Sequence, residues 1–186
     1  MNEEFLAALA TLAKFAPTIG GQQANDDGLG FCNPPAMGTA IYINDENGSF
    51  YTVDLSKPKG QQKVFVPQKA IKGYIKGLRT GIREYKGKPS LKVRVDILAD
   101  KLYMLEKAAN TNFAGGLLLS LLAAKDSLSE PVIIEISEPA EKQEKTCFCN
   151  LYTAEGRVRV EDKSVYRKED EKYIEELIAE INKGLE

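Results

Sequence analysis

Two long runs of alternating apolar and charged residues, joined by a short turn, constrain the fold of this chain more than any other feature. Between residues 91 and 97 every odd-numbered residue is apolar and every even-numbered residue is charged. Residues 70–83 form a second run marked by glycines, with Ile71 and Ile75 on one face of an extended chain and Lys72, Tyr74 and Lys76 on the other. Because successive side chains of a strand point to opposite faces, both runs predict strands with one face in a core and the other toward solvent.

Three glycines, Gly73, Gly77 and Gly81, recur at every fourth position of the first run. A glycine inside a strand offers no side chain to pack, and it often marks a bulge or a strongly coiled strand. Such strands are typical of small closed barrels. The residues from Glu84 to Pro89 are expected to form the turn into the second run.

The rest of the chain predicts further strands and three helices. Asn47-Gly48 lies between two alternating segments and predicts a β-hairpin over residues 39–55. Further strands are expected at residues 63–66, 102–105, 132–136, 146–152 and 157–160. Amphipathic or apolar helices are expected at residues 1–16, at 112–124 with Asn112 as the N-cap, and at 168–186.

Positive charge is concentrated in one tract of an acidic chain. The 186 residues contain 25 Lys and Arg and 27 Asp and Glu, which leaves a net charge of −2. Residues 57–94 contain twelve Lys and Arg but one acid, Glu84, so this tract carries +11 and the remainder of the chain −13. Such segregation favours a face that binds a polyanion; the alternative is a solvated strand surface that happens to be basic.

The chain contains no histidine, which excludes Ser-His-Asp and Cys-His catalysis and most zinc sites. Its three cysteines argue against a disulfide scaffold and for a reducing compartment, so a cytoplasmic protein is expected. Cys147 and Cys149 lie two residues apart in a predicted strand and are expected to be buried apolar residues. No catalytic residue, metal or cofactor is predicted, and no segment reaches the length of a membrane span.

The elements expected between residues 70 and 153 are three strands, a helix and two strands, in the order of the OB-fold, a small five-stranded barrel. The segments IKGYIKGLRTGIREYKGKPSLKVRVDI, KLYMLE, FAGGLLLSLLAA and PVIIEI resemble, in this order, single-stranded DNA-binding proteins of phage, plasmid and replication protein A type. The resemblance covers somewhat less than half of the chain. Tryptophan, a common stacking residue of these proteins, is absent, and residues 1–66 match no part of them.

The resemblance implies a mainly β fold with α-helices, of the all-β or α+β class. Its centre would be a five-stranded OB-fold barrel, residues 67–162, with a helix between strands three and four. Residues 1–66 would form an N-terminal extension made of a helix, a loop and a β-hairpin. Residues 163–186 would form a C-terminal amphipathic helix.

The same resemblance implies a binding cleft across the second and third strands and the loops that border them. The matching positions are Arg83, Tyr85, Lys86, Lys88, Lys92, Arg94 and Tyr103, with Tyr74 as a looser match. The charged residues of the first strand add Lys72, Lys76 and Arg79. Lys and Arg bind phosphates with release of counterions, and the bases of a single strand stack on aromatic rings and guanidinium planes. Each tyrosine could instead be an ordinary residue of the barrel edge.

The sequence therefore predicts a protein that binds single-stranded DNA with little sequence preference, in replication, recombination or repair, and that is not an enzyme. RNA stays open as a second ligand. Two other classes remain: an OB-type module whose basic face binds an acidic protein, and a small enzyme with acids such as Asp26, Asp27 and Asp45 as metal ligands. The terminal helices are expected to pack on the barrel or to bind a second copy or a partner protein.

Overall fold

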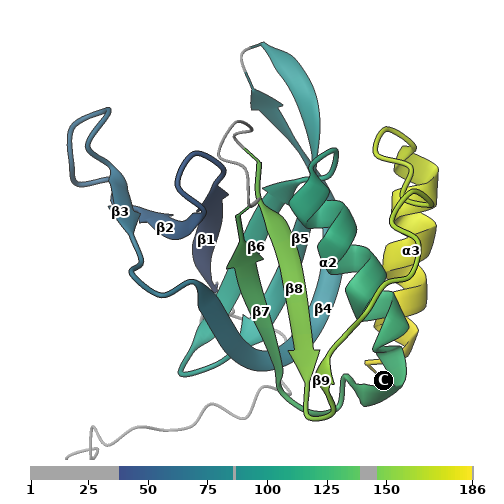
Figure 1. Ribbon diagram of the computed structural model, residues 1–186. Coiled ribbons are helices and arrows are strands. Elements are labelled where there is room, and N and C mark those ends of the chain that lie inside the picture. Colours follow the sequence, from purple (N-terminus) through teal and green to yellow (C-terminus); the bar gives the residue numbers. More distant parts are fainter. Residues whose placement is uncertain (1–37, 86, 139–145, 186) are drawn as a thin grey trace, which may run out of the picture. The chain divides into compact units, whose positions relative to one another are not determined.

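The computed structural model describes residues 38–85, 87–138 and 146–185, which belong to one compact unit beginning at residue 36 (Figure 1). This part of the chain is mainly β, with one mixed sheet and two α-helices. The predicted combination of α and β structure is thus confirmed. The helix predicted at residues 1–16 and Cys32 lie outside the described residues. Among the helices that the structure describes, none combines the length and the apolar composition of a membrane span.

The described sheet has nine strands, which hydrogen-bond in the order β3-β2-β1-β6-β5-β4-β7-β8-β9. Their bounds are β1 Thr39–Asn44, β2 Ser49–Val53, β3 Lys63–Phe65, β4 Ala70–Tyr85, β5 Lys88–Leu98, β6 Leu102–Ala108, β7 Val132–Ser137, β8 Phe148–Thr153 and β9 Gly156–Arg157. The helices are α2 (Asn112–Ala123), a short 3₁₀ helix (Lys125–Ser127) and α3 (Glu171–Lys183). Neighbouring strands are antiparallel, except that β1 runs parallel to β6.

The strands β4 to β8 and the helix α2 follow the predicted chain order, but the closed barrel is not confirmed. In the order β6-β5-β4-β7-β8 the outer strands are β6 and β8, so a closed barrel would pair these two. Instead β1 pairs with β6, with Ile41 opposite Leu105. The N-terminal hairpin therefore supplies the hydrogen-bond partners of this edge, and the sheet of the described residues stays open.

Strand β4 joins the two halves of the sheet. Its residues 74–85 pair with β5 and its residues 70–73 pair with β7, and the register shifts between Ile75 and Gly77. At Gly73 a Cβ atom would lie 2.6 Å from the carbonyl oxygen of Leu98. Only glycine fits where β4 passes so close to the end of β5. The register shift lies next to Gly77, so the predicted bulge is confirmed at that glycine, whereas Gly81 lies in regular pairing with β5.

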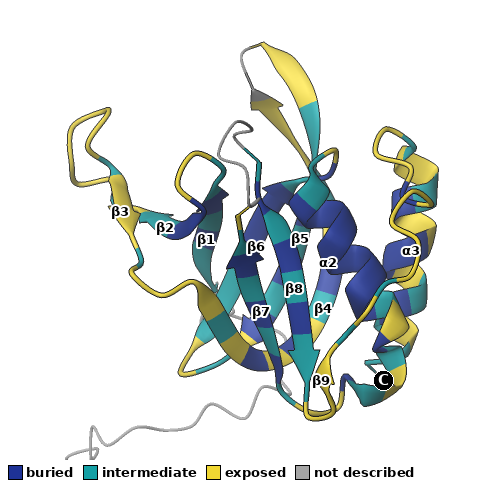
Figure 2. Cartoon of the chain, viewed as in Figure 1, coloured by how far each residue is buried: buried dark blue, intermediate teal, exposed yellow. Residues whose placement is uncertain are grey.

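The core lies between the sheet and the two helices. Residues 113–121 of α2 are all buried, because β8 packs on one side of this helix and α3 on another (Figure 2). A helix enclosed in this way is apolar around its whole circumference. Its N-cap is Thr111, one residue before the predicted Asn112, and the Oγ1 atom of Thr111 accepts a hydrogen bond from the backbone N–H of Ala114.

The C-terminal helix α3 packs on α2 and β4, as the sequence predicted for an amphipathic helix. The predicted apolar stripe is buried at Ile174, Leu177, Ile178 and Ile181. Asn182 pairs with the backbone of β4: its Nδ2 donates to the carbonyl of Leu78 and its Oδ1 accepts from the N–H of Leu78, both at 2.9 Å. One side chain thus replaces a neighbouring strand at this point of the β4 edge.

This contact gives a prediction for stability. Replacing Asn182 by Ala leaves the buried backbone of Leu78 without these partners, which costs about 1–2 kcal/mol of unfolding free energy after the better helix propensity of Ala is included. Urea denaturation measures the difference. The control is Glu176→Ala on the exposed face of α3, where only a 3.7 Å pair with Lys172 is lost, and it should change stability by less than about 0.5 kcal/mol. Equal stability of the two variants would contradict the assigned role of Asn182.

Candidate nucleic-acid interface

Strands β1 to β6 expose the face of the sheet that is opposite the core, which we call the outer face. On the core face of β5, Val93, Val95 and Ile97 are buried, whereas the residues between them point to the outer face, as predicted. Strand pairing aligns six residues across six neighbouring strands of this face: Phe65, Tyr51, Tyr42, Glu106, Arg94 and Arg79. Aromatic residues form one half of this line, and charged residues form the other.

The aromatic half consists of Phe65, Tyr51 and Tyr42, one residue from each strand of the N-terminal segment. The ring centres of Tyr42 and Tyr51 are 5.3 Å apart with 28° between the planes, and those of Tyr51 and Phe65 are 6.1 Å apart. The side chain of Lys63 places its Nζ 4.8 Å from the centre of the Tyr51 ring. Phe65, at the outer end, keeps 47% of its surface exposed. The sheet therefore presents a short row of aromatic rings with a cation above it.

The charged half is organised around the carboxylate of Glu106, which is only 4% exposed. Its Oε2 accepts a hydrogen bond from Nε of Arg94 at 2.8 Å and lies 3.2 Å from Nε of Arg83. Arg83 also donates to the hydroxyl of Tyr42 at 3.4 Å, and its guanidinium lies 5.9 Å from the centre of that ring. The hydrogen bond to Tyr42 and the charge of Glu106 raise the pKa of Arg83. Two guanidinium groups thus share one carboxylate and continue the aromatic row.

A groove of about 650 Å³ runs beside this line and is lined by Tyr42, Tyr51, Lys63, Lys92 and Glu106, among other residues. Lys92 forms no hydrogen bond or ion pair with another described residue. Partial burial lowers the pKa of its ammonium, and the neighbouring Glu106 partly offsets this effect. Lys92 is therefore a cation that is held at the groove and is available to an anionic ligand.

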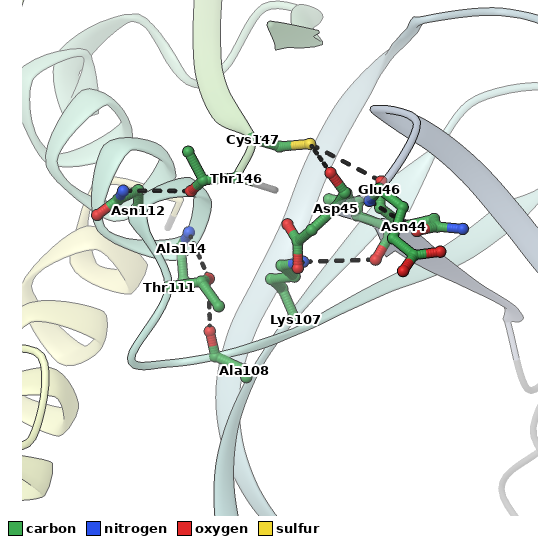
Figure 3. A network of polar contacts seen from close by, with 11 residues as sticks. Asn44, Asp45, Glu46, Lys107, Ala108, Thr111, Asn112, Ala114, Thr146 and Cys147 are labelled. Atoms are coloured by element: carbon green, nitrogen blue, oxygen red, sulfur yellow. Dashed lines mark hydrogen bonds and ion pairs between the residues drawn. The ribbon is translucent and has the colours of Figure 1, made fainter. Parts of the chain in front are cut away.

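The loop between β1 and β2 forms one wall of the groove and is fixed by polar contacts (Figure 3). Lys107 is buried, and its Nζ donates to Asp45 Oδ2 at 2.6 Å and to the carbonyl of Ile43 at 3.4 Å. Cys147 Sγ lies 3.7 Å from the carbonyl oxygen of Asp45 and 3.8 Å from that of Asn44. Burial raises the pKa of the Cys147 thiol, with Asp45 adding to the effect. Asp45 is thus the partner of an internal lysine.

Four of the residues predicted for the cleft lie together on the outer face: Arg79, Arg83, Lys92 and Arg94. Arg79 pairs with Asp96 and contacts the sulfur of Met104. Three others, Lys72, Tyr74 and Lys76, are exposed on β4. Lys72 and Tyr74 precede the register shift and Lys76 lies within it, with its Nζ 5.8 Å from the centre of the Tyr74 ring. Lys88 is exposed at the start of β5.

The structure does not bring Tyr103 together with these residues. Tyr103 pairs with Ile97, a residue of the core face, and packs half-buried against the core. Its hydroxyl donates to Asp100 at 3.4 Å, and Lys101 Nζ lies 5.3 Å from its ring centre. Of Tyr85 only the backbone is described, and Lys86 lies outside the described residues.

Sequence reasoning missed the aromatic half of the line, together with Lys63 and Glu106. The sequence does show Tyr42 and Tyr51 in the two alternating runs beside Asn47-Gly48, and this spacing places them near one another in a hairpin. No local pattern indicates that β1 pairs with β6, about sixty residues later, because strand pairing over that distance depends on the whole fold. The sequence predicted that Cys147 and Cys149 are buried. Cys147 directly precedes β8 and Cys149 lies within it, and the burial of both is confirmed.

Comparisons of the chain with models of known protein families, with curated proteins and with solved structures find no match. Among the described residues, no three side chains of His, Cys, Asp or Glu are grouped so that they could hold a metal ion. The site is therefore characterised by its own geometry: a row of planar side chains, a shared buried carboxylate and adjacent lysines.

The buried carboxylate gives the second prediction. Glu106→Ala leaves Arg94, whose side chain is 22% exposed, without its ionic partner, and we expect the free energy of unfolding to fall by about 1–3 kcal/mol. The more exposed Arg83 regains part of its solvation, which keeps the loss below that of a fully buried pair. The matched control is Glu130→Ala in an exposed turn, which should stay within about 0.5 kcal/mol of wild type. A Glu106→Ala variant as stable as this control would show that the shared carboxylate does not hold the site together.

Proposed function

We propose that this chain binds single-stranded DNA, with little sequence preference, through the outer face of β1 to β6. The observation that carries the proposal is the line of planar side chains from Phe65 through Tyr51 and Tyr42 to the guanidinium groups of Arg83 and Arg94. Rings and guanidinium planes offer stacking surfaces to unpaired bases. A duplex keeps its bases stacked inside, so such a face favours a single strand.

The lysines beside the line support the proposal, because a nucleic acid also needs partners for its phosphates. Lys63 lies above the Tyr51 ring and Lys92 lines the groove. Exposed Lys72, Lys76 and Lys88 extend positive charge along β4 and β5. Phosphate contacts of this kind release counterions and are independent of base sequence, and every base has a face that can stack. The proposed binding is therefore sequence-tolerant and sensitive to salt.

The chain order of β4, β5, β6, α2, β7 and β8 supports a relation to OB-fold proteins that bind single strands. In this proposal the N-terminal hairpin, which pairs with β6, replaces the closing strand and contributes the aromatic half of the surface. A protein of this kind holds single strands during replication, recombination or repair and performs no chemistry on them.

The size of the face limits the length of the bound strand. Six neighbouring strands at a spacing of ~4.8 Å make the aligned row about 24 Å long. At ~3.4 Å per stacked nucleotide, this length holds about seven nucleotides, and fewer if the strand is extended. We therefore propose a site of about four to seven nucleotides, at the small end of the range for OB-type domains.

The length estimate is tested with oligothymidines of increasing length at constant low salt. Affinity is expected to rise steeply up to about seven nucleotides and then only by the statistical factor for additional overlapping sites. A duplex of equal length should compete poorly, and affinity for the single strand should fall steeply as salt increases. A duplex preference, or binding without salt dependence, would contradict the proposed function, and failure to bind either form of DNA would favour a protein ligand.

Single substitutions separate stacking from charge. Tyr42→Leu keeps an apolar side chain but removes the ring, so affinity for single-stranded DNA should fall by ~1–3 kcal/mol with an unchanged salt slope. Lys92→Ala should instead flatten the logarithmic salt slope by about 0.7, the value for one phosphate contact of a single strand. The control is Tyr103→Leu, because Tyr103 faces the opposite side of the sheet, and it should bind like wild type. If Tyr103→Leu loses affinity and Tyr42→Leu does not, the bound face has been assigned wrongly.

A further inference from the structure

We infer that Arg94 is a base-stacking platform and not a phosphate ligand, and that Gly81 is the residue that permits this role. The inference rests on the proposed function, because it assigns parts to residues within the same site. It divides the basic residues of the outer face into two groups: arginines that contact bases and lysines that contact phosphates. Sequence position alone gives no reason for such a division, because Arg94 and Lys92 are neighbours on the same face of β5.

The first observation is the orientation of the Arg94 side chain. A Cβ atom at Gly81 would lie 2.7 Å from Nη1, 2.8 Å from Cζ and 3.2 Å from Nη2 of Arg94. Three atoms of the guanidinium at nearly equal distances from one point mean that the plane of the group faces the backbone of β4 at Gly81. One face of this plane is therefore covered by the strand, and the Arg94 side chain keeps 22% of its surface exposed. A guanidinium in this orientation resembles an aromatic ring lying flat on a sheet.

The second observation is the charge around Arg94. Its Nε donates to the buried Oε2 of Glu106 at 2.8 Å, and the same oxygen also contacts Arg83. A phosphate that approached these arginines would meet the carboxylate as well, which weakens the attraction. Lys92 also has Glu106 as a neighbour, but it forms no hydrogen bond or ion pair with that carboxylate or with any other described residue, and it lines the groove. The charges thus favour phosphate at Lys92 and an uncharged base at Arg94.

The third observation is continuity with the aromatic row. Arg83 lies 5.9 Å from the centre of the Tyr42 ring and shares Glu106 with Arg94. Planar groups therefore follow one another from Phe65 on β3 to Arg94 on β5. A strand that stacks along this row crosses the β-strands at a steep angle, and Gly81 lies at its end, where a side chain would displace the last platform.

The experiment compares two Gly→Ala variants of β4 in their binding to a seven-nucleotide oligothymidine. Gly81→Ala pushes the flexible end of Arg94 off the strand, whereas Gly77→Ala places its Cβ in open space. Both glycines lie on the paired part of β4, and thermal melts check that both variants fold. We expect Gly81→Ala to bind about fivefold or more weakly than wild type, the lower end of the range for one lost base stack. We expect Gly77→Ala to bind within about twofold of wild type.

Arg94→Lys supplies the readout that distinguishes stacking from charge. The lysine keeps the positive charge but has no planar group. The Arg94→Lys variant should therefore bind the oligothymidine as weakly as Gly81→Ala does, with the wild-type salt slope. Wild-type affinity of Arg94→Lys, or of Gly81→Ala, would overturn the inference while the proposed function stands. If Arg94→Ala flattens the slope by about 0.7, Arg94 is a phosphate ligand and the inference is likewise overturned. Failure of the wild-type chain to bind any single strand is a different result, and it overturns the proposed function itself.

Discussion

The described structure depends on the hydrogen bonding of one strand, β4. Over sixteen residues it pairs with β7, then with β5, and its edge at Leu78 is completed by Asn182 of α3. A buried backbone polar group without a partner costs as much as a lost hydrogen bond, so all three neighbours must be present together. The strand can hydrogen-bond with all three neighbours only because it bends. The bend requires a residue without a side chain at position 73, because Gly73 lies against Leu98 at the end of β5.

The outer face follows from the same arrangement. Because β5 lies between β4 and β6, arginines of β4 and β5 meet Glu106 of β6, whose buried carboxylate is tolerated only with cationic partners. Because β1 pairs with β6, Tyr42, about sixty residues earlier in the chain, lies opposite Glu106 and accepts a hydrogen bond from Arg83. The aromatic and the basic parts of the proposed site therefore come from segments that are separate in sequence and adjacent in the sheet.

The charge of the basic tract is not spread evenly over this face. Lys69 donates to the carbonyl oxygens of Asn47 and Gly48 and pairs with Glu138, so it ties the hairpin loop to the end of β7. Arg79 is neutralised by Asp96, and Arg83 and Arg94 share Glu106. Lysines such as Lys92 keep their charge available. The +11 counted in the sequence is thus an upper limit, because acids from outside the tract neutralise several of its members.

The sequence by itself determined the local elements, because these depend on spacing between neighbouring residues. The period of two in residues 91–97 predicted which side chains of β5 are buried, and the apolar stripe of α3 predicted a packed helix; both are confirmed. The tertiary structure alone decided which elements meet. Whether β6 pairs with β8 or with β1 depends on the relative stability of contacts between distant segments, and no local pattern contains that comparison. For the same reason the sequence assigned Tyr103 to the same cleft as Arg94, whereas the fold places Tyr103 on the core face and Glu106 beside Arg94.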